Sequence, residues 1–253
     1  MRLSALPAFE DNFIWVLRDA NRSLLVDPGE AAPVLAAADA GLVPSAILLT
    51  HHHPDHVGGV PELLRRWPGL PVFAPDDARI ALDCERVGDG DRLRLLDRDV
   101  QVLAVPGHTS NHLAYVVEDH LFCGDTLFSL GCGRMFEGTP EQMLHSLQRL
   151  AALPGQTRVC CGHEYTLANA AFAREVEPGN AALAARGAEV ARLRAAGEAT
   201  LPSTIASERD CNPFLRCDAQ EVLSSVGRRL GHTPADAVEA FATLRAWKDT
   251  FRA

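Results

Sequence analysis

The segment Leu48–Val60 reads LLTHHHPDHVGGV and holds four of the chain's ten histidines. Its first residues continue an aliphatic run, which predicts a buried strand that emerges into a loop. Alternate side chains of an extended chain point the same way, so His51 and His53 can converge while His52 points away. We therefore expect His52 to be solvated or structural, and the two rings beside it to work together.

The rest of this segment places a carboxylate next to an imidazole. Pro54 turns the chain, after which the adjacent Asp55 and His56 can face a second point. Imidazole and carboxylate are ligands that zinc, iron and manganese accept, at roughly 2.0–2.2 Å for zinc. Converging ligands of these two types suit two metal ions better than one.

Three later segments repeat one arrangement, in which a predicted strand is followed by glycine and then by a ligand-type residue. These residues are His108 in VPGHTSNH, Asp125 in CGDTLF and His163 in CGHEY. Loops at strand ends, held by a rigid scaffold, are where active sites tend to be assembled. The sequence therefore predicts a metal site built from several strand ends.

The predicted elements change in character near residue 165. Apolar runs rich in Val, Leu and Ile alternate with turns before it, and alanine-rich helical patterns dominate after it. The expected strands cover 13–18, 23–26, 46–50, 71–74, 100–105, 113–117, 120–123 and 158–161. The expected helices cover 31–40, 61–67, 140–152, 180–196, 219–231 and 235–251, with a loop at 201–213. This order predicts a layered α/β catalytic domain over 1–165 and a small helical substrate-binding domain over 166–253.

The composition of the chain argues against several classes of protein. Its 253 residues are 47% hydrophobic and 23% charged, which is typical of a globular protein. The net charge of -9 argues against affinity for nucleic acid or for an anionic membrane. A signal-peptide pattern and an apolar run of about 18 residues are both lacking. We expect a cytoplasmic monomer whose seven cysteines are reduced.

Four motifs occur in a fixed order along the chain: THHHPDH at 50–56, PGHT at 106–109, GDTLF at 124–128 and CGHEYT at 161–166. They resemble the metallo-β-lactamase superfamily and, within it, the glyoxalase II family of hydroxyacylglutathione hydrolases. The resemblance runs from PAFEDNFIWVL at 7–17 through GCGRMFEGT at 131–139 to NPFLR at 212–216 and RAWKD at 245–249. It implies an αββα sandwich with a small all-helical C-terminal domain.

The same resemblance implies two divalent metal ions, zinc first, with iron or manganese as alternatives. A hydroxide that bridges the two ions would be the nucleophile, and Asp55 would be both a ligand and a candidate proton acceptor. The first ion would be held by His51, His53, His108 and Asp125, and the second by Asp55, His56, Asp125 and His163.

The resemblance also implies a substrate, S-D-lactoylglutathione or another 2-hydroxyacylglutathione. Its thioester would be hydrolysed to D-lactate or another 2-hydroxy acid and glutathione, the second step of methylglyoxal detoxification. Arg245 and Lys248 lie three apart in a predicted helix, a spacing that by itself also fits a solvated helix face. By resemblance they bind the glutathione part together with Arg134, Phe136 and Tyr165. Arg134 replaces a lysine and Phe136 a tyrosine that are common in the family, so one hydroxyl contact is missing.

Other activities are compatible with parts of this pattern. A lactonase or a broader acyl-thioester hydrolase of the same fold would not require the motifs at 212–216 and 245–249. A persulfide dioxygenase-like iron enzyme would use one iron with two His and one Asp, which leaves part of the second ligand set without a role. A third class, non-catalytic metal storage or nucleic-acid processing, is disfavoured by the net negative charge of the chain and by the lack of a basic groove. We interpret Cys123 and Cys160 as small buried apolar residues rather than ligands.

Overall fold

The computed structural model describes residues 1–252 and divides the chain into two compact units. Unit 1 is made of Met1–Ala104, Asn111–Gly124 and Cys160–His163. Unit 2 is made of Val105–Ser110, Asp125–Val159 and the chain from Glu164 onward. The units are therefore interleaved in sequence, so each is assembled from segments that lie far apart along the chain.

The first sheet of unit 1 has six strands, in chain order from β1 to β6. Its strands are β1 (Arg2–Ala8), β2 (Asn12–Asp19), β3 (Arg22–Val26), β4 (Pro44–Leu48), β5 (Val72–Pro75) and β6 (Glu85–Val87). β1, β2 and β3 pair antiparallel, whereas β3, β4, β5 and β6 pair parallel. Because β3 and β4 are parallel neighbours, their carboxyl ends lie at the same edge of the sheet.

The second sheet of unit 1 runs in the order β13-β10-β9-β8-β7. Its strands are β7 (Arg92–Leu95), β8 (Arg98–Ala104), β9 (Leu113–Val117), β10 (His120–Gly124) and β13 (Arg158–Cys161). The pairs from β7 to β10 are antiparallel. The chain after β13 leads directly to His163.

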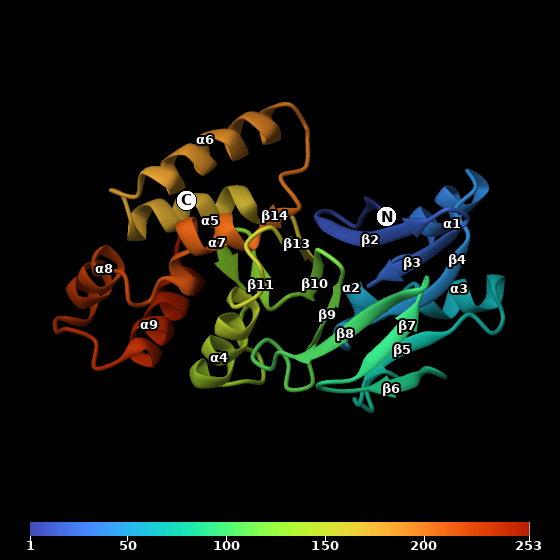
Figure 1. Cartoon of the computed structure of the whole chain (residues 1–253). Helices are drawn as coiled ribbons and strands as arrows, with labels where there is room; N and C mark the ends of the chain where they lie inside the picture. The colour runs from blue at the N-terminus through green and yellow to red at the C-terminus, as the bar shows by residue number, and fades with distance from the viewer. Residues whose placement is uncertain (253) are drawn as a thin grey trace. The chain divides into compact units, whose positions relative to one another are not determined.

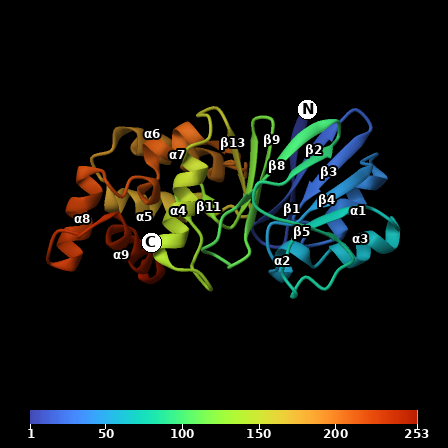
Figure 2. The same ribbon diagram turned by 60° about the horizontal axis from the view of Figure 1, so that its bottom comes forward.

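Helices α1 (Ala32–Asp39) and α3 (Val60–Arg66) cover one face of the first sheet (Figure 1, Figure 2). The side chains buried between them include Ile14, Val16, Leu25, Val34, Ile47 and Leu63. The residues alternating with these point to the other face, where Trp15 Nε1 donates to the carbonyl of Cys161 at 2.9 Å. The two-residue period of the strands thus gives this sheet two buried faces.

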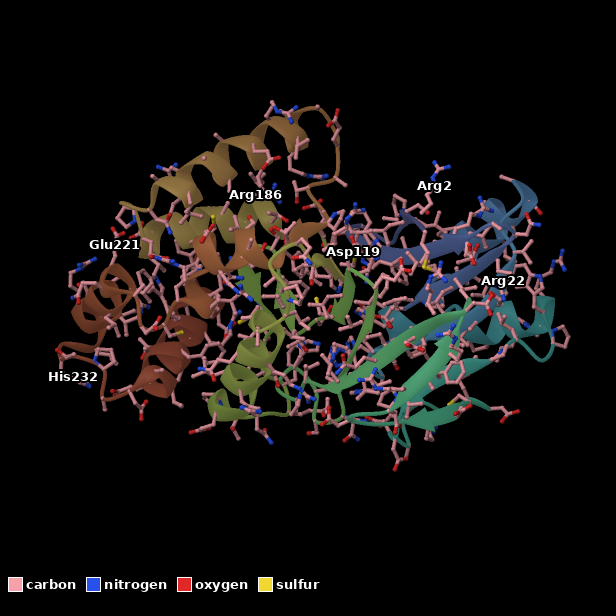
Figure 3. All side chains as sticks on the ribbon, viewed as in Figure 1. Arg2, Arg22, Asp119, Arg186, Glu221 and His232 are labelled. Carbon is pink, nitrogen blue, oxygen red and sulfur yellow. The ribbon has the colours of Figure 1, made fainter. Side chains whose placement is uncertain are left out.

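Unit 2 is mainly helical, as expected for the C-terminal part of the chain. Its helices are α4 (Pro140–Ala151), α5 (Thr166–Val176), α6 (Ala181–Ala195), α7 (Ile205–Cys211), α8 (Gln220–Leu230) and α9 (Ala237–Thr250). Its short strands are β11 (Leu127–Phe128), β12 (Gly131–Cys132) and β14 (Ser203–Thr204). Glu221, labelled at the start of α8 in Figure 3, accepts a hydrogen bond from the backbone of Gly179 at 2.8 Å. Among residues 1–252 no helix is long and apolar enough to cross a lipid bilayer.

The sheets and the C-terminal helices confirm the predicted α/β class, but several element predictions need correction. Among the elements that were not predicted are β6, β7, α2 (Pro54–Val57), β11 and β12. The expected loop at 201–213 contains β14 and α7, where Thr204 caps the helix by accepting from Ser207 N at 3.2 Å. Helix α5 was not predicted, and strand β1 was missed because its pairing with β2 is what orders it. These elements depend on tertiary contacts more than on local periodicity.

Asn212, the first residue of the NPFLR motif, joins several backbone groups of unit 2. It is fully buried, its Nδ2 donates to the carbonyls of Phe128 and Gly131 at 3.1 and 2.9 Å, and its Oδ1 accepts from Phe214 N at 3.1 Å. Because Asn212→Ala leaves these buried groups without partners, we expect the free energy of unfolding to fall by roughly 2–4 kcal/mol. Urea unfolding followed by circular dichroism measures this loss. The exposed Asn21→Ala is the control, and equal losses from both variants would contradict the role of Asn212.

Candidate metal centre

Strand β4 leads into the histidine cluster, whose rings point in two directions. His51 Nε2 and His53 Nδ1 lie 3.0 Å apart, so these two rings converge as predicted. His52 points away, and its Nδ1 lies 3.5 Å from the carboxylate of Asp77. Hydrogen bonds from Arg79 lower the pKa of Asp77 to about 2, so this carboxylate stays charged beside His52. His52 therefore has a partner outside the converging pair.

Asp55, His56 and His163 form a second convergence in unit 1. The short helix α2 (Pro54–Val57) places Asp55 and His56 in one turn, and His163 follows β13. Asp55 Oδ2 lies 3.6 Å from His56 Nε2 and 3.4 Å from His163 Nε2. One ligand atom from each residue falls within 4.8 Å of the others. Asp55 and His56 thus face a common point, as predicted from the sequence, and His163 faces the same point.

Asp27 orients the histidines from behind, a role that the sequence analysis did not identify. Its Oδ2 lies 3.0 Å from His56 Nδ1 and accepts from Thr50 Oγ1 at 2.7 Å, while Thr50 Oγ1 lies 3.0 Å from His51 Nδ1. These contacts are on the Nδ1 side of both rings, so Asp27 fixes the orientation of His56 directly and that of His51 through Thr50. The sequence feature that could have indicated this role is the position of Asp27 directly after β3. Because β3 and β4 are parallel, Asp27 lies at the same edge of the sheet as the histidines that follow β4.

This donor set fits a divalent metal ion. A carboxylate can only accept, so the Nδ1–H groups of His56 and His163 donate to Asp27 and Asp11, the latter at 2.8 Å. Each ring then presents the lone pair of Nε2 toward Asp55, the form in which a histidine binds metal. Imidazole and carboxylate together suit zinc, iron and manganese alike. The His and Asp groups therefore imply divalent metal binding without selecting the element.

His108 and Asp125 form a comparable pair within unit 2. His108 Nδ1 donates to the carbonyl of Arg134 at 2.8 Å, and its Nε2 lies 3.5 Å from Asp125 Oδ2. The preceding Gly107 has φ of 150°, and a Cβ there would meet the side chain of Met143 at 2.8 Å. A glycine before this histidine is therefore required by both conformation and space. As in His56 and His163, the Nδ1 atom of His108 is hydrogen-bonded and its Nε2 atom faces a carboxylate, here that of Asp125.

The predicted substrate residue Arg245 is buried in unit 2, with 5% of its surface exposed. Its guanidinium donates to the carbonyl of Cys132 at 2.7 Å and to Asp249 Oδ1 at 3.0 Å, and it lies 5.2 Å from the ring centre of Phe214. Arg134 Nε lies 3.6 Å from the same Asp249 oxygen. The solvated-face alternative is thus wrong for Arg245, which holds the fold of unit 2 together as well.

Lys248 lies one turn further along α9 and is half-buried. Its ammonium donates to the carbonyl of Ala168 at 3.1 Å and lies 5.4 Å from the ring centre of Phe172. Burial, with the nearby charge of Arg245, lowers the pKa of Lys248 to about 8. Phe136 is 63% exposed and Tyr165 38% exposed. Lys248 is therefore a cation of unit 2 that loses its charge above about pH 8, at a lower pH than an exposed lysine.

The seven cysteines of the described chain are free thiols, and six of them are buried. Cys123 and Cys160 are packed in the core, as interpreted from the sequence. Burial raises the pKa of Cys132 and Cys211 to about 11 and that of Cys217 to about 12. Among residues 1–252 the His and Asp clusters described above include no thiol.

Comparison with known proteins agrees with this geometry. The family described as metallo-beta-lactamase superfamily matches residues 9–163, and that described as hydroxyacylglutathione hydrolase C-terminus matches residues 164–251. A hydroxyacylglutathione hydrolase of Xanthomonas euvesicatoria pv. vesicatoria (strain 85-10) is 60% identical over 254 residues, covering 100% of both chains. Another, from Xylella fastidiosa (strain M23), is 59% identical over 252 residues, covering 99% of this chain and 98% of its own.

The fold is also found among solved structures. The crystal structure of ETHE1 from Myxococcus xanthus matches with a TM-score of 0.64 at 25% identity, covering 98% of this chain and 100% of that one. The predicted metallo-β-lactamase fold and the resemblance stated from the motifs are both confirmed. The chain belongs to the hydroxyacylglutathione hydrolases, within the metallo-beta-lactamase superfamily.

Proposed function

We propose that this enzyme is a dinuclear metal-dependent thioesterase that hydrolyses S-D-lactoylglutathione and related 2-hydroxyacylglutathiones. The observation that carries the proposal is the convergence of Asp55, His56 and His163 in a chain about 60% identical to hydroxyacylglutathione hydrolases. The products are glutathione and a 2-hydroxy acid, D-lactate for the first substrate. The reaction is then the second step of methylglyoxal detoxification.

The proposed ligand set is assigned by family membership. The first ion is assigned to His51, His53, His108 and Asp125, and the second to Asp55, His56, Asp125 and His163. When bound, two divalent ions supply a water of lowered pKa and polarise a carbonyl. The chain itself holds the Nε2 atoms of His56 and His163 in place, and we assign Asp55 as a candidate proton acceptor as well as a ligand. We assign zinc first, with iron or manganese as alternatives.

A thioester suits this chemistry because a thiol of pKa near about 8.5 leaves without a strong general acid. The site therefore needs no serine or cysteine nucleophile. Free thiols throughout residues 1–252 suit a reducing compartment, so we assign the enzyme to the cytoplasm. We also propose that it acts as a monomer. The partner is then a small glutathione thioester, with no role for nucleic acid or membrane.

The decisive experiment compares substrates on one preparation of known metal content. We expect S-D-lactoylglutathione to be hydrolysed far faster than a lactone or a β-lactam, with about two ions per chain and loss of activity on chelation. Preference for the lactone would support the lactonase alternative, and broad thioester activity would support a general acyl-thioester hydrolase. Consumption of oxygen with a persulfide, at one iron per chain, would support the dioxygenase-like alternative.

Lys248 is proposed to bind a carboxylate of glutathione together with Arg134, Phe136, Tyr165 and Arg245. Lys248→Ala should raise KM by about ten- to a hundredfold, since a charge-assisted hydrogen bond contributes roughly 1.5–3 kcal/mol. The lowered pKa of Lys248, about 8, means that its charge is present below pH 8 and lost above it. KM of the wild type should therefore rise as pH passes 8, with kcat little changed. Steady-state kinetics from pH 6.5 to about 9.5 measures both constants.

Lys248→Arg is the matched control, because a guanidinium stays charged throughout this range. Its KM should remain low above pH 8, whereas KM of Lys248→Ala should be high and independent of pH. A small uncharged thioester, which offers no carboxylate, should show neither effect. Equal rises in KM for both substrates would contradict the assignment. Arg245→Ala is a poorer test, because Arg245 also supports the fold through Cys132.

A further inference from the structure

The turn between β1 and β2 contacts two of the three residues in the Asp55, His56 and His163 cluster. Asp11 Oδ1 accepts from His163 Nδ1 at 2.8 Å. The adjacent Asn12 Nδ2 donates to Asp55 Oδ2 at 3.0 Å, the oxygen that faces the two Nε2 atoms. Two neighbouring side chains of one turn therefore hold one imidazole and one carboxylate of this cluster.

The turn is itself fixed at both ends. Phe13 N donates to the carbonyl of Gly162 at 2.8 Å, and Asn12 forms an isolated antiparallel bridge with His163. On its other side, Phe9 N donates to Glu30 Oε2 at 2.6 Å, and Phe9 has a φ of 50°. The backbone of the turn is thus anchored to the segment that carries His163. Asp11 and Asn12 can position their partners because their own backbone is held.

The other histidines of unit 1 are oriented by a different group. His56 Nδ1 donates to Asp27, and His51 Nδ1 contacts Thr50, which donates to the same carboxylate. Asp27 is buried, whereas the side chain of Asp11 is 39% exposed. The two carboxylates therefore serve different ligands and lie in different surroundings. Changes at Asp11 should act on one metal site alone.

We infer that Asp11 and Asn12 are positioning residues for the second metal ion, and that they set its affinity separately from that of the first. This inference rests on the proposed function, since it requires two ions. Asp11 fixes His163 with its proton on Nδ1 and raises the basicity of Nε2, while Asn12 fixes the orientation of the Asp55 carboxylate. Neither residue is itself a ligand.

The test is zinc titration of the metal-free protein in competition with a chromophoric chelator, which resolves two binding steps. Partners that orient metal ligands typically contribute 10–100-fold in affinity. Asp11→Ala should therefore weaken one zinc by about that factor and leave the other unchanged. Asp11→Asn, which keeps an acceptor oxygen but no charge, should lie between Asp11→Ala and the wild type. Asn12→Ala should weaken the same step.

Glu10→Gln is the matched control, because it removes the same charge from the exposed neighbouring position in the same turn. Its two zinc affinities and the thermal midpoint of its metal-free form should equal those of the wild type. Two unchanged affinities in Asp11→Ala, or equal losses at both steps, would overturn the inference while leaving the proposed function intact. A wild type that binds fewer than two ions would overturn the proposed function and this inference with it.

Discussion

His53→Ala is expected to abolish thioester hydrolysis and to remove the first metal ion. His53 Nδ1 lies 3.0 Å from His51 Nε2, so its loss leaves the converging pair incomplete. The loss in kcat/KM should exceed about a hundredfold, because even groups that only orient ligands contribute 10–100-fold in affinity. Elemental analysis beside steady-state kinetics measures both effects on one sample.

His52→Ala is the control for this variant, since it changes the neighbouring ring by the same substitution. His52 faces Asp77 at 3.5 Å, a distance too long for a strong hydrogen bond, so activity and metal content should stay near those of the wild type. Equal losses from His52→Ala and His53→Ala would show that the wrong ring was assigned to the metal.

Asp125→Asn is expected to weaken both metal ions at once. In the proposed ligand set Asp125 is shared, and a neutral amide removes the negative charge that both cations need. We expect each zinc affinity to fall by at least about tenfold, with hydrolysis lost in proportion. The substitution keeps the size of a side chain that is only 6% exposed, so packing should be preserved.

Zinc titration of Asp125→Asn separates a shared ligand from a terminal one. A single weakened step would mean that Asp125 serves one ion only, and the bridging assignment would then be wrong. Thermal unfolding of the metal-free variant is the control for its fold. Its midpoint should match that of the wild type within a few degrees, because the substitution keeps the size of the buried side chain.

Local patterns in the sequence were sufficient for much of this site. The two-residue period of an extended chain predicted that His51 and His53 converge, and the turn at Pro54 predicted a second point for Asp55 and His56. The glycine before each later ligand-type residue marked a strand end. Each of these signals lies within a few residues of the candidate ligand that it marks, which is why a single sequence reveals it.

The orienting residues could not be found in this way. Asp27 is 29 residues from His56, and Asp11 is 152 residues from His163, so their contacts exist only after the sheets have formed. The same holds for α7, whose Glu208 accepts from the backbone of Leu130, 78 residues away. Arg245 was predicted from the family motif as a substrate contact, but its burial against Phe214 required the packed structure.

The interleaving of the two units has a consequence for synthesis on the ribosome. Unit 1 is completed only by Cys160–His163, which leave the exit tunnel after the whole segment Asp125–Val159. His163 is therefore the last of its cluster to emerge, long after Asp55 and His56. Until that point a nascent chain offers only part of the Asp55, His56 and His163 cluster, so tight capture of the proposed second ion follows the closing of unit 1.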